Sequence, residues 1–233
     1  MKKNIVFLPC RKGSQRIPNK NARVFAGIKG GLLHIKLQQL IQTAEVDEIF
    51  LSSDDETVLE IGASMNSRKI KLLPRPVHLC LSSTTTDELI DYVPTIINDD
   101  ATIIWTHVTS PFLSSRTYSE MIHLYYEKFG EYDSLMSVNS LRTFLWNNEN
   151  PLNYDRTVEK WPRTQTLPIW YEVNSGAFIA DIATYRQRHD RIGEHVQLYE
   201  TSKLESIDID WPEDFDYAEM IYKNYFDKTK AVE

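Results

Sequence analysis

The 233-residue sequence has only two cysteines and no apolar stretch long enough to cross a membrane. A membrane-spanning helix needs about 20 apolar residues, whereas the first apolar run ends after about six, before Arg11, which is also too short for a signal peptide. Cys10 and Cys80 are not spaced as metal ligands, and their apolar neighbours favour small buried thiols. We therefore expect a cytoplasmic protein that has no contact with membranes.

The chain also lacks an excess of positive charge. It has 26 lysines and arginines against 33 aspartates and glutamates, which gives a formal net charge of −7. This balance argues against broad electrostatic binding to nucleic acid or to an anionic membrane. A local cluster of cations is therefore expected to serve one small anion.

Two common phosphate-binding fingerprints are missing as well. There is no Gly-Lys-Ser/Thr of a Walker loop, and the three spaced glycines of a dinucleotide site are absent. Instead, the run Asn4–Cys10 predicts a buried strand, and the segment Arg11–Asn21 follows it with four cations, one glycine, one serine and no acid. Open α/β sheets bind ligands at the carboxyl ends of their strands. We therefore interpret Arg11–Asn21 as a phosphate-binding loop; a solvated basic loop is the alternative.

Apolar strand-like runs alternate with helix-like stretches along the rest of the chain. This alternation predicts one α/β domain over residues 1–233, with a mostly parallel sheet and helices on both faces. Strands are expected over residues 4–10, 48–53, 69–73, 102–106, 133–138, 176–180 and 206–209, with a short one possible at 196–199. Helices are expected over residues 30–43, 54–66, 85–98, 114–129, a stretch ending near 190, and 211–226.

Residues 139–171 do not follow this alternation of strands and helices. The segment is rich in aromatic side chains among Asn, Pro and Arg: Phe144, Trp146, Tyr154, Trp161, Trp170 and Tyr171. Such an aromatic stretch between α/β units is typical of a lid on the core, a substrate wall or a subunit interface.

The loop Arg11–Asn21 resembles the signature of the cytidylyltransferases that activate sialic acids, the CMP-N-acylneuraminate synthetases. Further segments resemble other motifs of that family and occur in the same order: Ser52–Glu56, Arg75-Pro76 with Ser83–Asp87, His107–Pro111, Arg163–Pro168 followed by Asn174, and Ser206–Asp214. The ordered matches extend from residue 5 to about residue 220, which is nearly the whole chain.

This resemblance implies a three-layer, Rossmann-like nucleotide-diphospho-sugar transferase fold with a dimerisation arm. It also implies a reaction in which CTP and a free nonulosonic acid, such as N-acetylneuraminate, legionaminate or pseudaminate, give a CMP-sugar and pyrophosphate with Mg²⁺ or Mn²⁺. Family members usually pair through an extended arm. On this basis residues 139–171 are expected to form the arm of a homodimer and part of the substrate wall.

The resemblance also assigns site residues. The triphosphate and cytidine are expected to contact Arg11, Gly13, Ser14, Gln15, Arg16, Lys20, Asn21, Arg75 and Thr86, and the acid sugar is expected to contact His107, Arg163, Gln165 and Asn174. Asp208 and Asp210 are two residues apart, which in an extended chain puts both carboxylates on one side, as a magnesium pair requires. Arg11 and Lys20 join this pair as expected catalytic residues. Asp210 could also cap the helix that follows.

Four positions depart from the family pattern: Gln15 replaces a lysine, His107 a glutamine, His78 an acid and Ser175 a glycine. They leave the other loop residues and the aspartate pair unchanged, so they bear on the identity of the sugar more than on the reaction class. A cytidylyltransferase for the related acid sugar Kdo, and a non-catalytic nucleotide-binding protein of the same fold, are the alternatives. The aspartate pair argues against the second, because a mere binding protein has no need of a metal pair.

Overall fold

The computed structural model describes residues 2–14, 16–98 and 100–230, with side chains up to residue 225. These parts of the chain form seven strands, six α-helices and two short 3₁₀-helices. The strands are β1 Lys3–Cys10, β2 Glu48–Ser53, β3 Ile70–Pro74, β4 Ala101–Thr106, β5 Ser134–Leu141, β6 Trp170–Asp181 and β7 Val196–Glu200. The helices are α1 Gly31–Gln42, α2 Glu56–Ser64, η1 Val77–Leu79, α3 Thr86–Ile96, α4 Ser115–Glu127, η2 Thr164–Thr166, α5 Ile182–Arg188 and α6 Pro212–Lys230.

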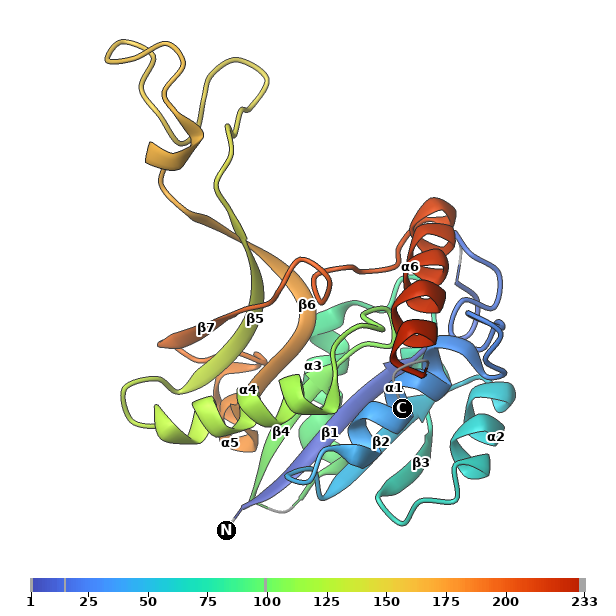
Figure 1. Cartoon of the computed structure of the whole chain (residues 1–233). Coiled ribbons are helices and arrows are strands. Elements are labelled where there is room, and N and C mark those ends of the chain that lie inside the picture. Colours follow the sequence, from blue (N-terminus) through green and yellow to red (C-terminus); the bar gives the residue numbers. More distant parts are fainter. Residues whose placement is uncertain (1, 15, 99, 231–233) are drawn as a thin grey trace.

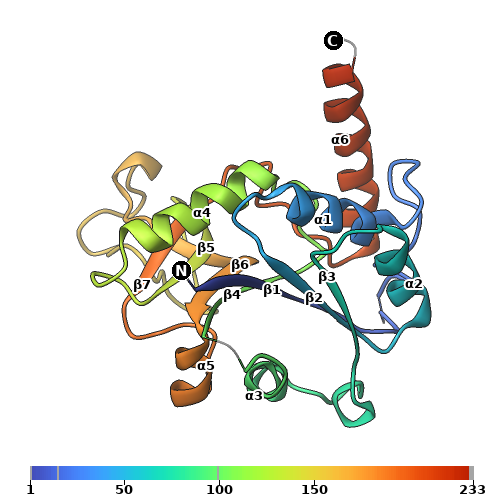
Figure 2. The same cartoon turned by 90° about the horizontal axis from the view of Figure 1, so that it is seen from below.

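The strands form one sheet in the order β3-β2-β1-β4-β6-β5-β7. β6 is antiparallel to its neighbours β4 and β5, and all other pairs are parallel. Helices α1, α2 and α4 cover one face and α3 and α5 the other (Figures 1 and 2). Alternate residues of β1 enter the two cores, Val6 and Leu8 on one face and Ile5 and Phe7 on the other. The predicted three-layer α/β fold is confirmed.

Helix starts lie where the capping residues of the sequence indicated. Asp55 accepts a hydrogen bond from the backbone N–H of Thr57 at the start of α2, and Ser114 does the same for Thr117 at the start of α4. Thr85 and Glu88 form a complete capping box on α3. Pro94 lies in the last turn of α3. The helix ends two residues later, at Ile96, and so before the predicted residue 98, since proline disfavours a continued helix.

Two strand boundaries differ from the prediction, and one predicted strand is absent. β5 and β6 are longer than expected because they continue to pair at the base of the segment 139–171, where Leu141 lies opposite Trp170. Residues 206–209 form no strand. The backbone N–H groups of Ser206 and Ile207 are used in turns with residues 202 and 204 and are not available to a sheet ladder. Ile209 N instead donates to Thr109 O, in the loop after β4, at 3.0 Å.

Residues 142–169 connect β5 to β6 and project away from the sheet as an arm (Figure 1). Within the arm, the rings of Phe144, Trp146, Tyr154 and Trp161 pack on one another at centroid distances of 5.2 to 6.5 Å. Trp146 and Trp161 remain 40% and 63% exposed. The aromatic residues therefore build a small cluster of their own and do not cover the core of this chain.

Candidate functional site

The strand ends of the parallel part of the sheet meet at one edge, and the loops that leave them line a cleft. The loop 11–21 follows β1, Asp54 and Asp55 follow β2, Arg75 follows β3, and His107 follows β4. Three adjoining cavities of about 470, 270 and 330 Å³ lie here, and Arg11 lines all three. This is the edge where a doubly wound sheet binds its ligand.

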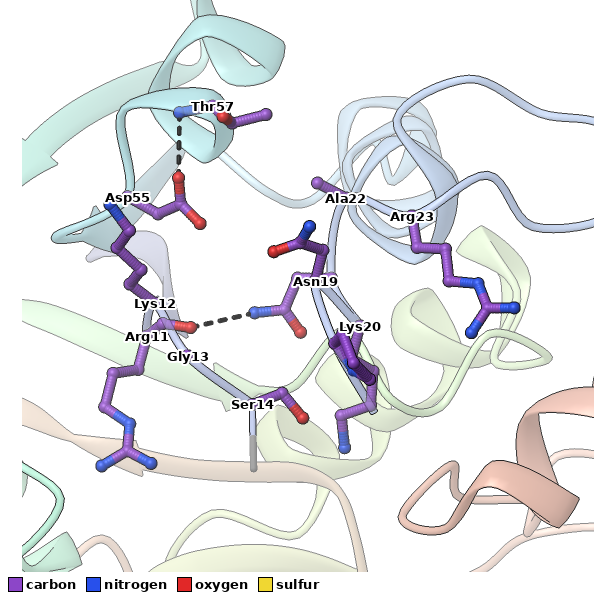
Figure 3. A pocket seen from close by; sticks show the side chains of 12 residues that line it. Arg11, Lys12, Gly13, Ser14, Asn19, Lys20, Ala22, Arg23, Asp55 and Thr57 are labelled. Atoms are coloured by element: carbon purple, nitrogen blue, oxygen red, sulfur yellow. Dashed lines mark hydrogen bonds between the residues drawn. The ribbon is translucent and has the colours of Figure 1, made fainter. Parts of the chain in front are cut away.

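The loop 11–21 is the cationic wall of this cleft. Figure 3 shows Arg11, Lys12 and Ser14 on one side of the largest cavity and Asn19 and Lys20 on the other. Asp54 Oδ1 accepts a hydrogen bond from the backbone N–H of Lys12 at 2.8 Å, which ties the loop to the end of β2. Gly13 has a φ of +75°, a conformation that favours glycine. Gln15, which was expected to bind nucleotide, lies outside the described residues.

The C-terminal part of the chain contacts this loop beside the cleft. Lys20 Nζ donates a hydrogen bond to Ile209 O at 2.7 Å and lies 3.5 Å from an Asp210 carboxylate oxygen. Arg16 lies 3.4 Å from the other Asp210 oxygen and stacks at 4.7 Å on the ring of Trp211. The fold thus brings together the two segments with the strongest motifs, although about 190 residues separate them.

Asp208 and Asp210 lie in different environments. Asp208 is largely buried, and its Oδ1 has no hydrogen-bond partner among the described residues. Burial raises the pKa of the Asp208 carboxyl, and a hydrogen bond from the Thr109 side chain partly offsets this effect. The Asp210 side chain is 49% exposed. At the start of α6, Asp214 Oδ2 reaches back and accepts from the backbone N–H groups of Asp210 and Trp211, which precede the helix.

The oxygen donors of Asp208 and Asp210 fit a magnesium ion. An unsatisfied buried carboxylate oxygen is costly unless a cation or a donor completes it, and Mg²⁺ is usually bound by one or two carboxylates together with substrate phosphates. In the part of the chain that the structure describes, no group of three His, Cys, Asp or Glu side chains could hold a metal. A metal at this place would therefore also need phosphate oxygens of a bound substrate as ligands, as it does in nucleotide sites.

The other end of the cleft contains Arg75 and Thr86. Arg75 is only 7% exposed, and its guanidinium donates to Ser52 Oγ at 3.2 Å and to Ser52 O at 2.8 Å. Burial lowers the pKa of Arg75. Because Thr85 is the helix cap, the Thr86 side chain is available to the cavity. Arg11 reaches this end too and donates to Leu81 O at 3.0 Å.

His107 lies between the two ends and lines both adjoining cavities. Its Nε2 is 3.0 Å from the indole nitrogen of Trp105. Because an indole N–H can only donate, Nε2 accepts, and the proton of the neutral ring is on Nδ1. Burial, aided by the positive charges of Arg191 and Lys36, lowers the pKa of His107 to about 3. The side chain is thus a neutral hydrogen-bond donor at any physiological pH.

Three residues expected at the sugar do not join the cleft of their own chain. Arg163 and Gln165 are exposed on the arm. Asn174 lies in β6 and is 8% exposed, and all its side-chain hydrogen-bonding capacity is used within the protein. Its oxygen accepts from Ser137 and Gly176, and its nitrogen donates to Asn139 and Thr201. The sugar-binding roles of these three residues stay predictions.

Comparison with known proteins gives a consistent result. A protein-family model described as Cytidylyltransferase matches residues 5–231. The chain belongs to this cytidylyltransferase family. It is 26% identical over 226 residues to the N-acylneuraminate cytidylyltransferase of Escherichia coli O18:K1:H7 (strain RS218 / NMEC), in an alignment that covers 93% of this chain and 51% of that protein. It is 25% identical over 234 residues to the pseudaminic acid cytidylyltransferase of Campylobacter jejuni subsp. jejuni serotype O:2, with 95% and 97% covered.

The chain therefore spans about half the length of the first of these relatives and nearly all of the second. The predicted resemblance to the CMP-nonulosonic acid cytidylyltransferases is confirmed at modest identity. Solved structures with the same fold include a CMP:2-keto-3-deoxy-manno-octonic acid synthetase complexed with CTP (TM-score 0.66, 15% identity, 96% of this chain and 100% of that chain covered). Another is the 4-diphosphocytidyl-2C-methyl-D-erythritol synthase of Anaerococcus prevotii (TM-score 0.68, 14% identity, 95% and 96% covered).

The chain also has residues near the cleft that sequence reasoning missed. Lys36 is fully buried in α1, where its Nζ donates to Ser110 O at 2.8 Å and to the hydroxyl of Tyr118 at 2.7 Å. Burial lowers the pKa of Lys36 to about 7, and the charge of Asp208 works in the opposite direction. A single lysine in the apolar stripe Leu32–Leu40 was the available signal. Arg191 and Trp211 carried no pattern in the sequence.

No helix within the described residues is long and apolar enough to span a membrane.

Proposed function

We propose that this cytidylyltransferase couples CTP to a free nonulosonic acid to give a CMP-sugar and pyrophosphate. The observation that carries the proposal is the meeting of the cationic loop with the aspartate segment in one cleft, through the contacts of Lys20 and Arg16 with Asp210. A site of this kind combines cations for a triphosphate with carboxylates for a metal. The resemblance of both segments to the sialic-acid family supports the choice of substrates.

In this reaction the anomeric hydroxyl of the sugar attacks the α-phosphorus and loses its proton. The new oxygen–phosphorus bond replaces the bond to pyrophosphate, which leaves. Catalysis of such a transfer is mainly positioning and stabilisation of negative charge. The triphosphate would be held by Arg11, Ser14, Arg16, Lys20 and Asn21. Arg75 and Thr86 would contact the cytidine at their end of the cleft.

Asp208 and Asp210 would hold Mg²⁺ (or Mn²⁺) in this proposal. The bound ion would neutralise charge on phosphate oxygens. Because Asp210 is also paired with Lys20 and Arg16, the same carboxylate would keep these cations close to the position of the phosphates. His107 would offer its Nδ1–H to the substrates from the middle of the cleft.

We propose further that two copies of the chain pair through the arm, and that Arg163 and Gln165 reach the cleft of the partner. Exposed aromatic and apolar side chains on the arm and at its base support this, since Trp161, Trp170 and Val173 are 63%, 44% and 48% exposed in the single chain and such residues are enriched in interfaces. Sedimentation velocity at micromolar concentration is expected to show a dimer. A monomer there would contradict the proposal.

The test of the function is pyrophosphate release from CTP and Mg²⁺ with N-acetylneuraminate, legionaminate, pseudaminate, Kdo or no sugar. Release is expected with one nonulosonic acid and not without sugar. Release with Kdo alone would show that the substrate is this related acid sugar and not a nonulosonic acid. No release with any sugar, together with retained CTP binding, would instead favour a non-catalytic nucleotide-binding protein.

A further inference from the structure

Arg191 lies in the loop after α5 and stacks on the sheet next to the cleft. Its guanidinium carbon is 3.6 Å from the ring centroid of Phe178 and 5.3 Å from that of Trp105. Phe178 on β6 and Trp105 on β4 are direct neighbours in the sheet. The guanidinium thus lies over two neighbouring aromatic rings of the sheet.

This surface is continuous with the cleft. Trp105 lines the cavity that also contains Arg11, Arg75 and Thr86, and it donates the hydrogen bond that orients His107. Among charged groups, Arg191 has the largest effect on the pKa of His107, which it lowers. Because Trp105 lies next to Arg191 on one side and bonds to His107 on the other, the guanidinium lies at the same end of the sheet as the cleft.

The guanidinium of Arg191 is partly buried and has no polar partner. It makes no hydrogen bond or ion pair with any residue in the described part of the chain. Burial lowers the pKa of Arg191, and the nearby acidic groups Tyr185, Asp190 and Asp87 oppose this effect through their charges alone. A guanidinium has five N–H donors in its plane, and stacking on Phe178 occupies only a face. A desolvated cation with free donors is costly unless an anion pairs with it. Its planar edge matches a carboxylate, which can accept two parallel hydrogen bonds.

We propose that Arg191 is a substrate-binding residue that holds the carboxylate of the acid sugar and so selects for acidic sugars. This inference rests on the proposed function and names a cation within the same chain for a role that the resemblance gave to Arg163. The geometry favours Arg191 within one chain, because Arg163 is exposed on the arm whereas Arg191 lies over Trp105, which lines the cleft and bonds to His107. The aromatic clamp holds the donors in place before the substrate arrives, which reduces the entropy lost on binding.

The experiment is a thermodynamic cycle between the protein and the sugar. Initial rates are measured for the active sugar of the panel and for its methyl ester, which lacks the negative charge. Wild type is compared with Arg191→Met, Arg191→Lys, Arg163→Met and Arg188→Met. Arg188 is the matched control, because it is in the last turn of α5 and pairs at 3.0 Å with Glu194, away from the cleft lining.

In wild type, esterification should lower kcat/KM by roughly 30-fold, the loss expected for charged hydrogen bonds. In Arg191→Met, the KM for the acid should rise by about the same factor, and the KM for CTP should change less than roughly 3-fold. Esterification should then lower kcat/KM of this variant by less than roughly 3-fold, because the partner of the carboxylate is already gone. Arg191→Lys should recover part of the loss, since it keeps the charge but not the two parallel bonds. Arg188→Met should behave as wild type.

Two other outcomes are distinguishable. If esterification still matters in Arg191→Met but no longer in Arg163→Met, the carboxylate partner is Arg163 and the inference is wrong while the proposed function stands. If wild type turns over none of the acids, the proposed function fails and the inference fails with it.

Discussion

Replacing Asp208 by asparagine is expected to reduce kcat/KM by roughly 10³-fold, as the loss of a group that organises transition-state charge does elsewhere. The reason lies in the surroundings of the Asp208 carboxylate. Asp208 Oδ1 is buried without a partner among the described residues, so the protein keeps a carboxylate where it is not needed for folding. The expected accompanying change is a higher Mg²⁺ concentration for half-maximal rate, measured by pyrophosphate release.

The same substitution should not weaken the fold. Burial raises the pKa of Asp208 in the native state above its ordinary value of 3.8. At a pH between 3.8 and the native pKa, the native state therefore binds more protons than the unfolded state. Stability from this group is therefore lost as the pH rises above about 4. Asp208→Asn removes that penalty and should match or exceed wild type in urea unfolding at pH 7, with the difference shrinking towards pH 3.

Asp216→Asn is the matched control, because Asp216 is exposed on α6 a few residues further on. It should leave both activity and Mg²⁺ response unchanged. Asp208→Asn that keeps activity within about 10-fold of wild type and an unchanged Mg²⁺ response would show that this carboxylate does not hold the metal.

The fold was predictable because its signals are local. Asp55, Ser114 and the Thr85–Glu88 capping box mark helix starts that the structure confirms, and apolar runs mark the central strands. The direction of β6 was not predictable, since it depends on where the arm turns back. The predicted strand at 206–209 was wrong because turn hydrogen bonds within residues 202–207 compete with a sheet ladder, and apolar periodicity does not report them.

In the site, too, some features could be predicted from the sequence and others could not. The loop 11–21 and Asp210 could be expected to meet, since both follow segments that end at the same edge of the sheet. The protonation state of His107 could not be predicted, because it depends on the indole of Trp105 and on two cations from distant segments, Lys36 and Arg191. Such residues have no motif of their own. Their roles depend on neighbours that only the folded chain brings into contact.

Lys20→Met should lower kcat/KM for CTP by roughly 10² to 10³-fold, the equivalent of about 2–4 kcal/mol of lost stabilisation of the transition state. Lys20 has two functions in the cleft. Its side chain is only 12% exposed, so its charge is poorly screened by solvent, and its bond to Ile209 O at 2.7 Å holds the aspartate segment against the loop.

A series of ligands separates these functions. If the charge of Lys20 acts on phosphates, affinity for cytidine should be the same in wild type and Lys20→Met, and the loss should grow from CMP to CTP, measured by calorimetric titration. Lys20→Arg should keep part of the CTP affinity, because it preserves the charge with a different shape. Lys29→Met, at an exposed lysine of the segment between the loop and α1, should bind every ligand as wild type does. An equal loss for cytidine and CTP in Lys20→Met would instead mean that the lysine acts only through Ile209 and Asp210, by keeping the two walls of the cleft together.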